Sequence, residues 1–331
     1  MPSPPAQATR ETETDTAPVS VAGLFAAAIL AGAGLGLAAP AAGDLLSHGT
    51  DATLLVLICL LFFELRLGAV IHASGQFHFL ALAWAANFVI VPVIGFAVAS
   101  LVLFREPILF AGLMIYFLAP CTDWFLGFTR MARGDTELGA ALIPVNLITQ
   151  LLLFPLWLWL LTRHSGFLDV ATFPQTLLQW FLLPLVAAQT LRICLEKLLP
   201  QEGFARLLDW MGRLVPLALA ALIAQIFAAN VGVIAAHGEV FALVALAVCL
   251  FFVAIFFISG GLARLGHLAY PQRALLGMTM AARNAPLMLA LTAAAIPDQP
   301  LILAAIVLGM LIEIPYLTAL KQLLLRRRKA G

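Results

Sequence analysis

The chain has 331 residues, of which 63% are hydrophobic and only 11% charged, and its formal net charge is +1. Its mean hydropathy of +1.04 and its few charged residues exclude a water-soluble globular domain, in which about a quarter of the residues are charged. Because a transmembrane helix needs about 20 mostly apolar residues, the length has room for about ten such helices. The composition therefore predicts an all-α integral membrane protein.

The first segment of the chain differs from the rest. Residues 1–18 are rich in Pro, Thr, Ala and acidic groups, so they cannot bury much apolar surface and we expect a disordered cytoplasmic tail. The apolar run that follows could belong to a cleaved signal peptide. However, Arg10 lies far from that run, and acidic residues stand between them where a basic region would be needed. We therefore interpret the run as a transmembrane span.

Ten apolar runs bounded by charged or turn residues follow one another along the chain. Their ranges are 19–41, 52–72, 77–101, 107–130, 135–162, 172–197, 211–232, 239–262, 271–296 and 299–320. Each is long enough to cross a bilayer as a helix. The sequence therefore predicts ten transmembrane helices, followed by a basic cytoplasmic tail at 321–331.

The positive charges indicate an orientation. If the N-terminus is inside, the cytoplasmic segments hold fifteen of the 18 Lys and Arg residues, and the outer segments hold only Arg105 and Arg163. Arg283 alone lies within a span. Because loops rich in Lys and Arg stay on the cytoplasmic side, we expect both termini to be cytoplasmic in a multi-pass protein of a bacterial-type inner (plasma) membrane.

The ten spans divide into two halves of five, and an odd number of spans requires the second half to be inverted relative to the first. The longest and most basic inner loop is expected at 198–210, after the sixth span. Residues 19–162 would form the first five-helix repeat, residues 163–171 an outer loop, and residues 172–320 the second, inverted repeat. Inverted repeats of this kind are typical of secondary transporters.

The fourth and ninth spans each contain a proline beside polar residues near the middle of the span. The two stretches are Ala119-Pro120-Cys121-Thr122-Asp123 and Ala282-Arg283-Asn284-Ala285-Pro286. Because proline removes a backbone hydrogen bond and clashes with the preceding turn, we expect both helices to be kinked or unwound at Pro120 and Pro286. Broken backbone at this depth is tolerated only where it is buried in protein or lines a cavity. Paired interruptions in two inverted halves indicate a transporter's binding site.

Three ionisable residues, Asp123, Arg283 and Glu313, are expected at mid-membrane depth, where each costs about 2.5–3.5 kcal/mol on insertion. Asp123 and Arg283 lie at equivalent depth on the two breaks, so they could pair or share a substrate; a purely structural bridge between the halves is the alternative. Glu313 lies in the tenth span beside Pro315. Its carboxylate could bind a coupling cation or accept a proton, or could instead form a hydrogen bond that packs two helices together.

Two amides and one thiol complete the set of candidate residues. Asn146 and Gln150 lie one helical turn apart in the fifth span, so both amides face the same way. They could supply ligands for a cation or hydrogen bonds for a polar solute, but amides also hold helices together. Of the four cysteines, Cys121 alone lies at a predicted break. Its thiolate would suit a soft metal or metalloid, although a buried cysteine is commonly just a small hydrophobe.

Enzyme signatures are absent from the sequence. It contains no H-E-x-x-H, G-x-G-x-x-G, P-loop or G-x-S-x-G motif, and its histidines show no metal-ligand spacing. We therefore expect no enzyme, no catalytic residues, no cofactor, no resident metal and no nucleic-acid partner. Without a nucleotide-binding motif, active transport should be driven by an ion gradient, by the membrane potential, or by a separate energising subunit.

Two groups of residues carry a family resemblance. The first consists of Cys121, the Ala132-Arg133-Gly134-Asp135 turn and the Asn146-x-x-x-Gln150 pair, and the second is the tenth-span string Leu311-Ile312-Glu313-Ile314-Pro315. Both resemble the arsenical-resistance permeases, which share a superfamily with the bile acid/sodium symporters. The resemblance implies a fold of two inverted five-helix repeats whose broken helices 4 and 9 cross near the membrane centre. It also implies that spans 1, 2, 6 and 7 form a panel and that the other six form a core.

The resemblance assigns roles to some residues and not to others. In the arsenical-resistance permeases the fourth-span cysteine and the tenth-span glutamate are needed for arsenite efflux, and the matching positions here are Cys121 and Glu313. The ninth span departs from the family's Ser-Asn-Asn-Phe-Glu stretch: Asn284 matches, but Arg283 replaces the serine and Leu287 stands at the acidic position. In the sodium-coupled symporters the ninth-helix acidic and amide residues help to bind sodium, so the missing carboxylate weakens the case for sodium coupling. Arg283 could instead suit an anionic solute.

These observations together predict a secondary active transporter that exports arsenite or a related metalloid by alternating access around a mid-membrane site. The alternative is a sodium- or proton-coupled symporter of an organic anion held by Arg283. The predicted partners are a small inorganic or organic anion or metalloid, the coupling ion H+ or Na+, and the lipid bilayer. The predicted substrate-binding residues are Cys121, Thr122, Asp123, Arg283 and Asn284, and the predicted ion-coupling residues are Asn146, Gln150 and Glu313.

Overall fold

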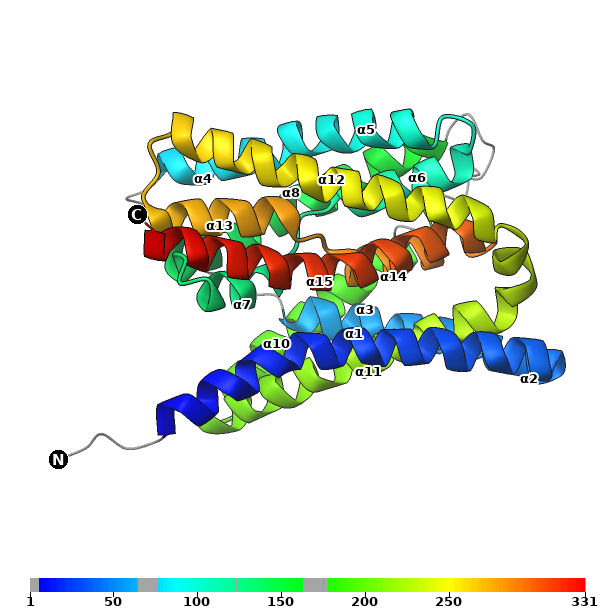
Figure 1. The fold of residues 1–331 in the computed structure, drawn as a ribbon. Coiled ribbons are helices and arrows are strands. Elements are labelled where there is room, and N and C mark those ends of the chain that lie inside the picture. The colour runs from blue at the N-terminus through cyan, green and yellow to red at the C-terminus, as the bar shows by residue number, and fades with distance from the viewer. Residues whose placement is uncertain (1–5, 65–76, 123, 163–174, 176–177, 331) are drawn as a thin grey trace.

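The fold consists of helices that lie side by side in two layers (Figure 1). The computed structural model describes residues 6–64, 77–122, 124–162, 175 and 178–330. The elements are α1 (Ala6–Ala38), α2 (Pro40–Ser47), α3 (Thr50–Glu64), α4 (Phe77–Ala85), the π-helix η2 (Ala86–Ile90), α5 (Val91–Val102), α6 (Pro107–Leu118), α7 (Trp124–Met131), α8 (Thr136–Thr162), the π-helix η3 (Leu178–Leu182), α10 (Leu183–Leu198), α11 (Gln201–Ala236), α12 (Gly238–Leu265), α13 (Tyr270–Ala281), α14 (Ala285–Ala295) and α15 (Pro300–Ala330).

Most of these helices are long and apolar enough to cross a bilayer. Within the described ranges, seven helical segments qualify by length and composition, and the pair α2 and α3, bent by 46°, makes an eighth. The seven segments are Val21–Ala38, Phe77–Val102, Thr136–Trp157, Leu178–Leu198, Gln201–Ala236, Gly238–Leu265 and Pro300–Arg328. The prediction of an all-α membrane protein is therefore confirmed. The count of ten spans in two inverted repeats remains a prediction.

The two other predicted spans, 107–130 and 271–296, are each broken in the middle. In the first, α6 ends at Leu118, and Ala119 before Pro120 adopts an extended conformation (φ −105°, ψ 106°), as expected of a residue that precedes proline. In the second, α13 ends at Ala281 and α14 begins at Ala285 with Pro286 in its first turn, where the missing N–H is harmless. Proline therefore ends one helix and starts another.

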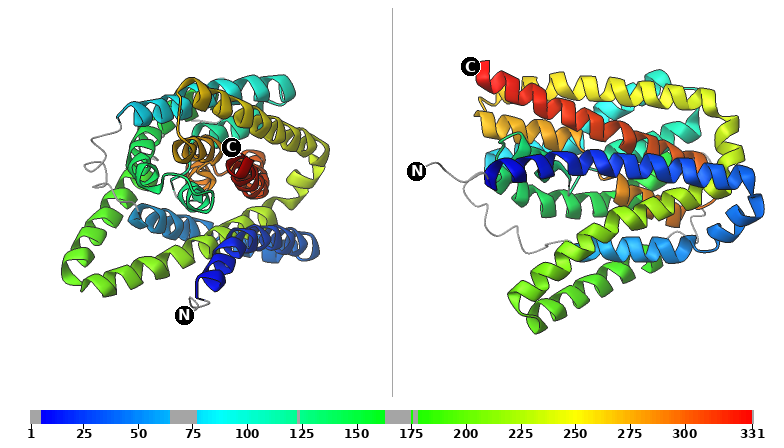
Figure 2. Two further views of the ribbon diagram at one scale, coloured as in Figure 1. Left: turned by 60° about the vertical axis from the view of Figure 1, so that its left-hand side comes forward. Right: turned by 60° about the horizontal axis from the view of Figure 1, so that its bottom comes forward.

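Two layers of helices can be distinguished. Helices α1, α2, α3, α10 and α11 pack on one another and form the lower layer of Figure 1, which we call the panel. The other helices form the core bundle, and Figure 2 shows the same division from two further sides. The panel contacts the core bundle through α14 and α15. This division corresponds to the panel and core that the family resemblance implies.

The panel is held together by a close approach of two backbones. Gly32 and Gly36 lie one helical turn apart on α1, and a Cβ on either would collide with the carbonyl oxygen of Ala224 or Ala228 on α11. Small residues spaced four apart on two facing helices allow the backbones to approach this closely. The approach increases dispersion contacts, which matter because the hydrophobic effect does not drive helix association in lipid. The first and seventh predicted spans therefore pack as a pair.

Replacement of Gly36 by Leu should separate α1 from α11 and destabilise the protein by about 3 kcal/mol, because the backbone carbonyl opposite cannot move out of the way. Gly34→Leu is the matched control: it lies on the same helix, and nothing lies within 4 Å of its Cβ position. Thermal unfolding of both variants in detergent tests the prediction. Equal melting temperatures for the two variants would contradict it.

The structure differs from the expected layout at both ends of the panel. Helix α1 begins at Ala6, within the segment expected to be a disordered tail. The basic loop expected at 198–210 is wrong, because only Leu199 and Pro200 separate α10 from α11. The first three turns of α11 carry the charges as ion pairs spaced four residues apart, Glu202 with Arg206 and Asp209 with Arg213. Such pairs support a helix, so the charged segment extends α11 rather than forming a loop.

A tight turn connects the second half of the broken fourth span to α8. Arg133 has a positive φ of 56°, and the Gly134 N–H bonds to the carbonyl of Thr129 at 2.8 Å, which is how a helix ends in a left-handed residue. The Asp135 carboxylate then accepts the N–H of Leu138 at 3.0 Å and caps the start of α8. The Ala132–Asp135 turn, which is part of the family resemblance, therefore connects α7 to α8.

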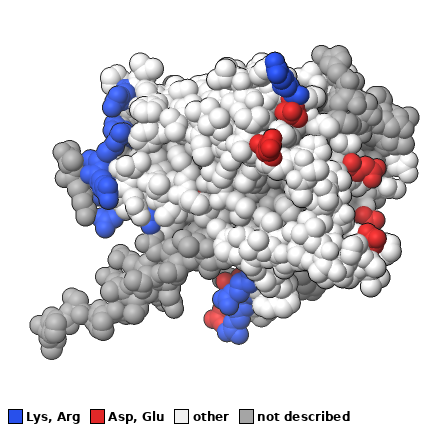
Figure 3. All heavy atoms as spheres, turned by 45° about the vertical axis from the view of Figure 1, so that its right-hand side comes forward, with Lys and Arg blue, Asp and Glu red and all other residues white. Residues whose placement is uncertain are grey.

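The charged residues are distributed unevenly along the core bundle. Figure 3 shows Lys and Arg gathered at the end where the chain finishes, and most Asp and Glu on that face toward the other end. Near the basic end, the guanidinium groups of Arg327 and Arg328 stack over the rings of Phe256 and Tyr270 at 5.0 and 5.4 Å. Stacking of this kind holds the charges at the surface over apolar neighbours.

Candidate functional site

The two helix breaks lie against each other in the core bundle. The Cys121 N–H donates to the carbonyl of Ala282 at 3.0 Å, and the Asn284 N–H donates to the carbonyl of Ala119 at 2.9 Å. These bonds form an antiparallel bridge between the two breaks. Each break thus satisfies two backbone groups of the other, as irregular backbone at membrane depth requires.

Polar side chains gather at this crossing. Cys121, Thr122 and Asn284 are all buried, with at most 3% of each exposed, and the Asn284 amide donates to the Thr122 hydroxyl at 3.1 Å. The structure therefore brings together three of the predicted substrate-binding residues from two segments about 160 residues apart in sequence. Asp123 lies outside the described residues, so its expected pairing with Arg283 stays a prediction.

Arg283 is at the same crossing, but its guanidinium is directed at backbone. Its Nη1 donates to the carbonyl of Phe117 at 3.0 Å, its Nη2 to those of Thr279 at 2.9 Å and Met280 at 2.8 Å, and its Nε to that of Ala281 at 3.4 Å. These carbonyls belong to the last turns of α6 and α13, where the helix dipoles place partial negative charge. The orientation differs from the expectation that Arg283 presents its charge to an anionic solute.

Glu313 connects α15 to both breaks. Its carboxylate accepts the backbone N–H of Arg283 at 2.9 Å and the hydroxyl of Tyr116 at 2.8 Å, and only 4% of the residue is exposed. Tyr116 is on α6, one turn before the break, and its ring packs so closely on Gly309 that a Cβ there would lie 2.8 Å from it. A carboxylate with two donors is held in one position. Any change in its charge would therefore act on the second break and, through Tyr116, on the end of α6.

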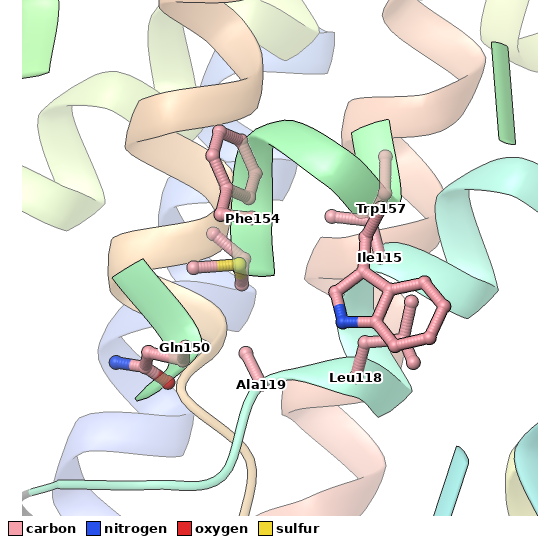
Figure 4. A pocket seen from close by; sticks show the side chains of 7 residues that line it. Ile115, Leu118, Ala119, Gln150, Phe154 and Trp157 are labelled. Carbon is pink, nitrogen blue, oxygen red and sulfur yellow. The ribbon is translucent and has the colours of Figure 1, made fainter. Parts of the chain in front are cut away.

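The two amides of α8 are buried without hydrogen bonds to the described residues. Neither the oxygen nor the nitrogen of the Asn146 and Gln150 side chains has a partner, and the two residues are 0% and 3% exposed. Gln150 lines a pocket that reaches the break at Ala119 (Figure 4), and the pocket is otherwise apolar. Its lining residues are Ile115, Leu118, Ala119, Gln150, Phe154, Trp157 and Met288. Gln150 therefore lies close to the crossing.

Sequence reasoning missed two polar residues close to the site. Tyr116 is the single hydroxyl-bearing residue of α6, and this polar group among apolar neighbours was a usable signal. Asn87 lies in η2 and donates to the Thr279 hydroxyl at 3.0 Å, which links the third predicted span to α13. A π-helical turn inside a longer helix is frequently found at functional sites. Asn87 was detectable as an amide in an apolar span.

Metal chemistry has little support in this arrangement. Among the residues that the structure describes, no group of three or more His, Cys, Asp or Glu side chains could hold a metal ion. The thiol of Cys121 is buried and forms no disulfide. A soft solute at the crossing would therefore meet a thiol and neighbouring hydroxyl and amide groups rather than a cage of thiolates.

Apolar spans, two broken helices that cross at mid-bundle, and buried polar groups at the crossing are the features of a membrane transporter. The sequence profile of the Sodium Bile acid symporter family matches residues 52–237, more than half of the chain, so the protein belongs to that family. The chain is also similar to the arsenical-resistance protein Acr3 of Corynebacterium glutamicum, with 29% identity over 259 residues that cover 73% of this chain and 69% of the relative. The predicted resemblance is thus confirmed.

Proposed function

We propose that the protein is a secondary transporter that exports arsenite or a related metalloid from the cytoplasm across the plasma membrane, with both termini cytoplasmic. The observation that carries this proposal is the position of Cys121, whose backbone is bonded to Ala282 at the crossing. A thiol is a ligand for soft elements. The similarity to a protein named for arsenical resistance supports the same substrate class.

The polar groups around the crossing suit a small uncharged solute. Arsenous acid, the protonated and uncharged form of arsenite near neutral pH, carries hydroxyl groups that both donate and accept hydrogen bonds. The unpartnered amides of Asn146 and Gln150 offer both kinds of partner, and Thr122 and Asn284 lie beside the thiol. We propose that the solute is bound between these groups and Cys121.

The organic-anion alternative has weaker support. It relied on Arg283 as the counter-charge, and the hydrogen bonds of that guanidinium go to carbonyls of α6 and α13. An anion that approached the guanidinium would have to displace these carbonyls or meet their lone pairs. The geometry therefore favours an uncharged solute over an organic anion at this site.

We further propose alternating access in which the core bundle moves against the panel, and coupling to protons through Glu313. The two layers meet through α14 and α15, so motion between them would alter the surroundings of the crossing. Glu313 bonds to Arg283 in the second break and to Tyr116 on α6, one turn before the first break, so protonation would remove its charge from beside the crossing. Coupling of such a switch to solute binding is a population shift between two states.

Arsenite uptake into everted membrane vesicles tests this function. Wild-type protein should accumulate arsenite when a proton gradient is imposed. Cys121→Ser should reduce uptake at least tenfold, since a hydroxyl is a poor ligand for a soft element, and Cys249→Ser, an exposed thiol elsewhere, should leave it unchanged. Absence of arsenite uptake by the wild type would overturn the proposal in favour of the organic-anion symporter. Full uptake by Cys121→Ser would remove the role of the thiol.

A further inference from the structure

We propose that Arg283 is a built-in cation that occupies the place of a soluble coupling cation between the C-terminal ends of α6 and α13, so that the transport cycle needs no Na+. The part about the transport cycle rests on the proposed function, whereas the part about the cation does not. Four backbone carbonyls accept hydrogen bonds from the guanidinium.

The C-terminal ends of two half-helices meet at one point inside the core bundle. Helix α6 ends at Leu118 and α13 ends at Ala281, and the breaks that follow are joined by the backbone bridge. Each helix end carries about half a negative charge, so the two ends together amount to about one elementary charge. In transporters with broken helices, such ends and the carbonyls beside them coordinate Na+. One positive charge at this meeting point would therefore balance the partial negative charges of the two helix ends.

Arg283 supplies that charge from within the chain. Nη1 reaches the last turn of α6, and Nη2 and Nε reach the last turn of α13, so one planar guanidinium spans both ends. The residue is 1% exposed and is among the largest fully buried side chains in the described part of the protein. A fixed cation that already fills the space and engages the carbonyls leaves no binding energy for a mobile one.

The nearby carboxylate does not take over this role. Glu313 accepts the backbone N–H of Arg283, while the guanidinium donates to carbonyls of α6 and α13. The guanidinium therefore acts on the helix ends, and the carboxylate acts on the break and on Tyr116. The two charges have separate partners, which allows Glu313 to change its protonation state while Arg283 keeps the helix ends together.

The first test uses the wild-type protein, purified at full length in detergent. Its thermal unfolding is measured in sodium chloride and in choline chloride at equal ionic strength. We expect melting temperatures that agree within about 1 °C, because a ligand stabilises a protein only if it has a site on the folded state. A saturable rise of several degrees with Na+ would overturn the proposal.

The second test removes the built-in cation and supplies a mobile one. Arg283→Ala should melt at least about 5 °C below the wild type, and millimolar guanidinium chloride should restore part of that loss. Arg213→Ala, an exposed arginine paired with Asp209, is the control and should show neither effect. Loss of stability in Arg283→Ala that neither guanidinium nor Na+ restores would show that no cation site exists and would overturn the proposal.

A third pair of variants covers the case in which Arg283→Ala does not fold. Arg283→Lys keeps the charge and Arg283→Met keeps the length without it, so the proposal expects the Lys variant to be clearly more stable, and equal stability would overturn it. These measurements need no substrate. A wild type that fails to carry arsenite would overturn the proposed function and leave the built-in cation untouched. Na+-dependent arsenite uptake would support the proposed function and overturn the built-in cation.

Discussion

Glu313→Gln is expected to lower arsenite uptake by about a hundredfold or more, in line with the loss of a group that transfers a proton, while the protein still folds. Glutamine has nearly the same shape as glutamate, and its carbonyl can accept the Arg283 N–H as the carboxylate does. Its amide nitrogen would face Tyr116, whose hydroxyl can turn from donor to acceptor. The substitution therefore removes the charge and keeps the contacts.

Uptake into everted vesicles, together with thermal unfolding of the purified variant, measures both parts of this expectation. Glu239→Gln, which changes an exposed residue in the first turn of α12, is the control and should transport normally. Proton-driven uptake near the wild-type rate in Glu313→Gln would mean that the carboxylate only packs α15 against the breaks. A variant that transports poorly and also melts much earlier would point to the same structural role.

Asn146→Leu is expected to separate stability from transport. The side-chain oxygen and nitrogen of Asn146 are buried without partners among the described residues, and each such group costs about 1–3 kcal/mol. Leucine has the same branching as asparagine and no polar atoms to satisfy, so the melting temperature should stay the same or rise. If the amide binds the solute, uptake should fall at least about tenfold, which is the cost of about 1.4 kcal/mol of lost binding.

Thr149→Ala serves as the control on the same helix, because its hydroxyl accepts the indole N–H of Trp84 rather than facing the crossing. Uptake and melting temperature should be measured for both variants in the same membranes. A loss of stability in Asn146→Leu would mean that the amide holds α8 in place, and unchanged uptake would mean that it does not bind the solute.

Hydropathy predicted the helical segments because membrane spans need long apolar runs, and proline predicted the two breaks because its ring stops a helix by steric clash. These are local properties of the chain. The charged stretch at the start of α11 was misread as a loop, since charge alone does not distinguish a loop from a helix that extends into water. The Glu202–Arg206 spacing was the signal that favoured a helix.

The arrangement at the crossing was predictable only in part. The equivalent depth of Asp123 and Arg283, together with the family resemblance, indicated that the breaks would meet, and the breaks do form the backbone bridge between Pro120 and Arg283. The partners of Arg283 were not predictable, because they are backbone carbonyls. Every residue has one, so the sequence does not show which of them will accept a hydrogen bond. The contact between Tyr116 and Glu313 joins residues 197 apart in the chain, a distance over which spacing gives no information.

Protection of the Cys121 thiol against labelling tests whether the solute binds at the crossing of the two breaks. In a variant whose other three cysteines are replaced by alanine, the rate of maleimide labelling of Cys121 is measured in membranes with and without arsenite. We expect arsenite to slow labelling in a saturable way, at the concentrations that saturate uptake, and Asn146→Leu to weaken this protection. Labelling at the same rate with and without arsenite, in vesicles that transport it, would show that the solute does not bind at the crossing.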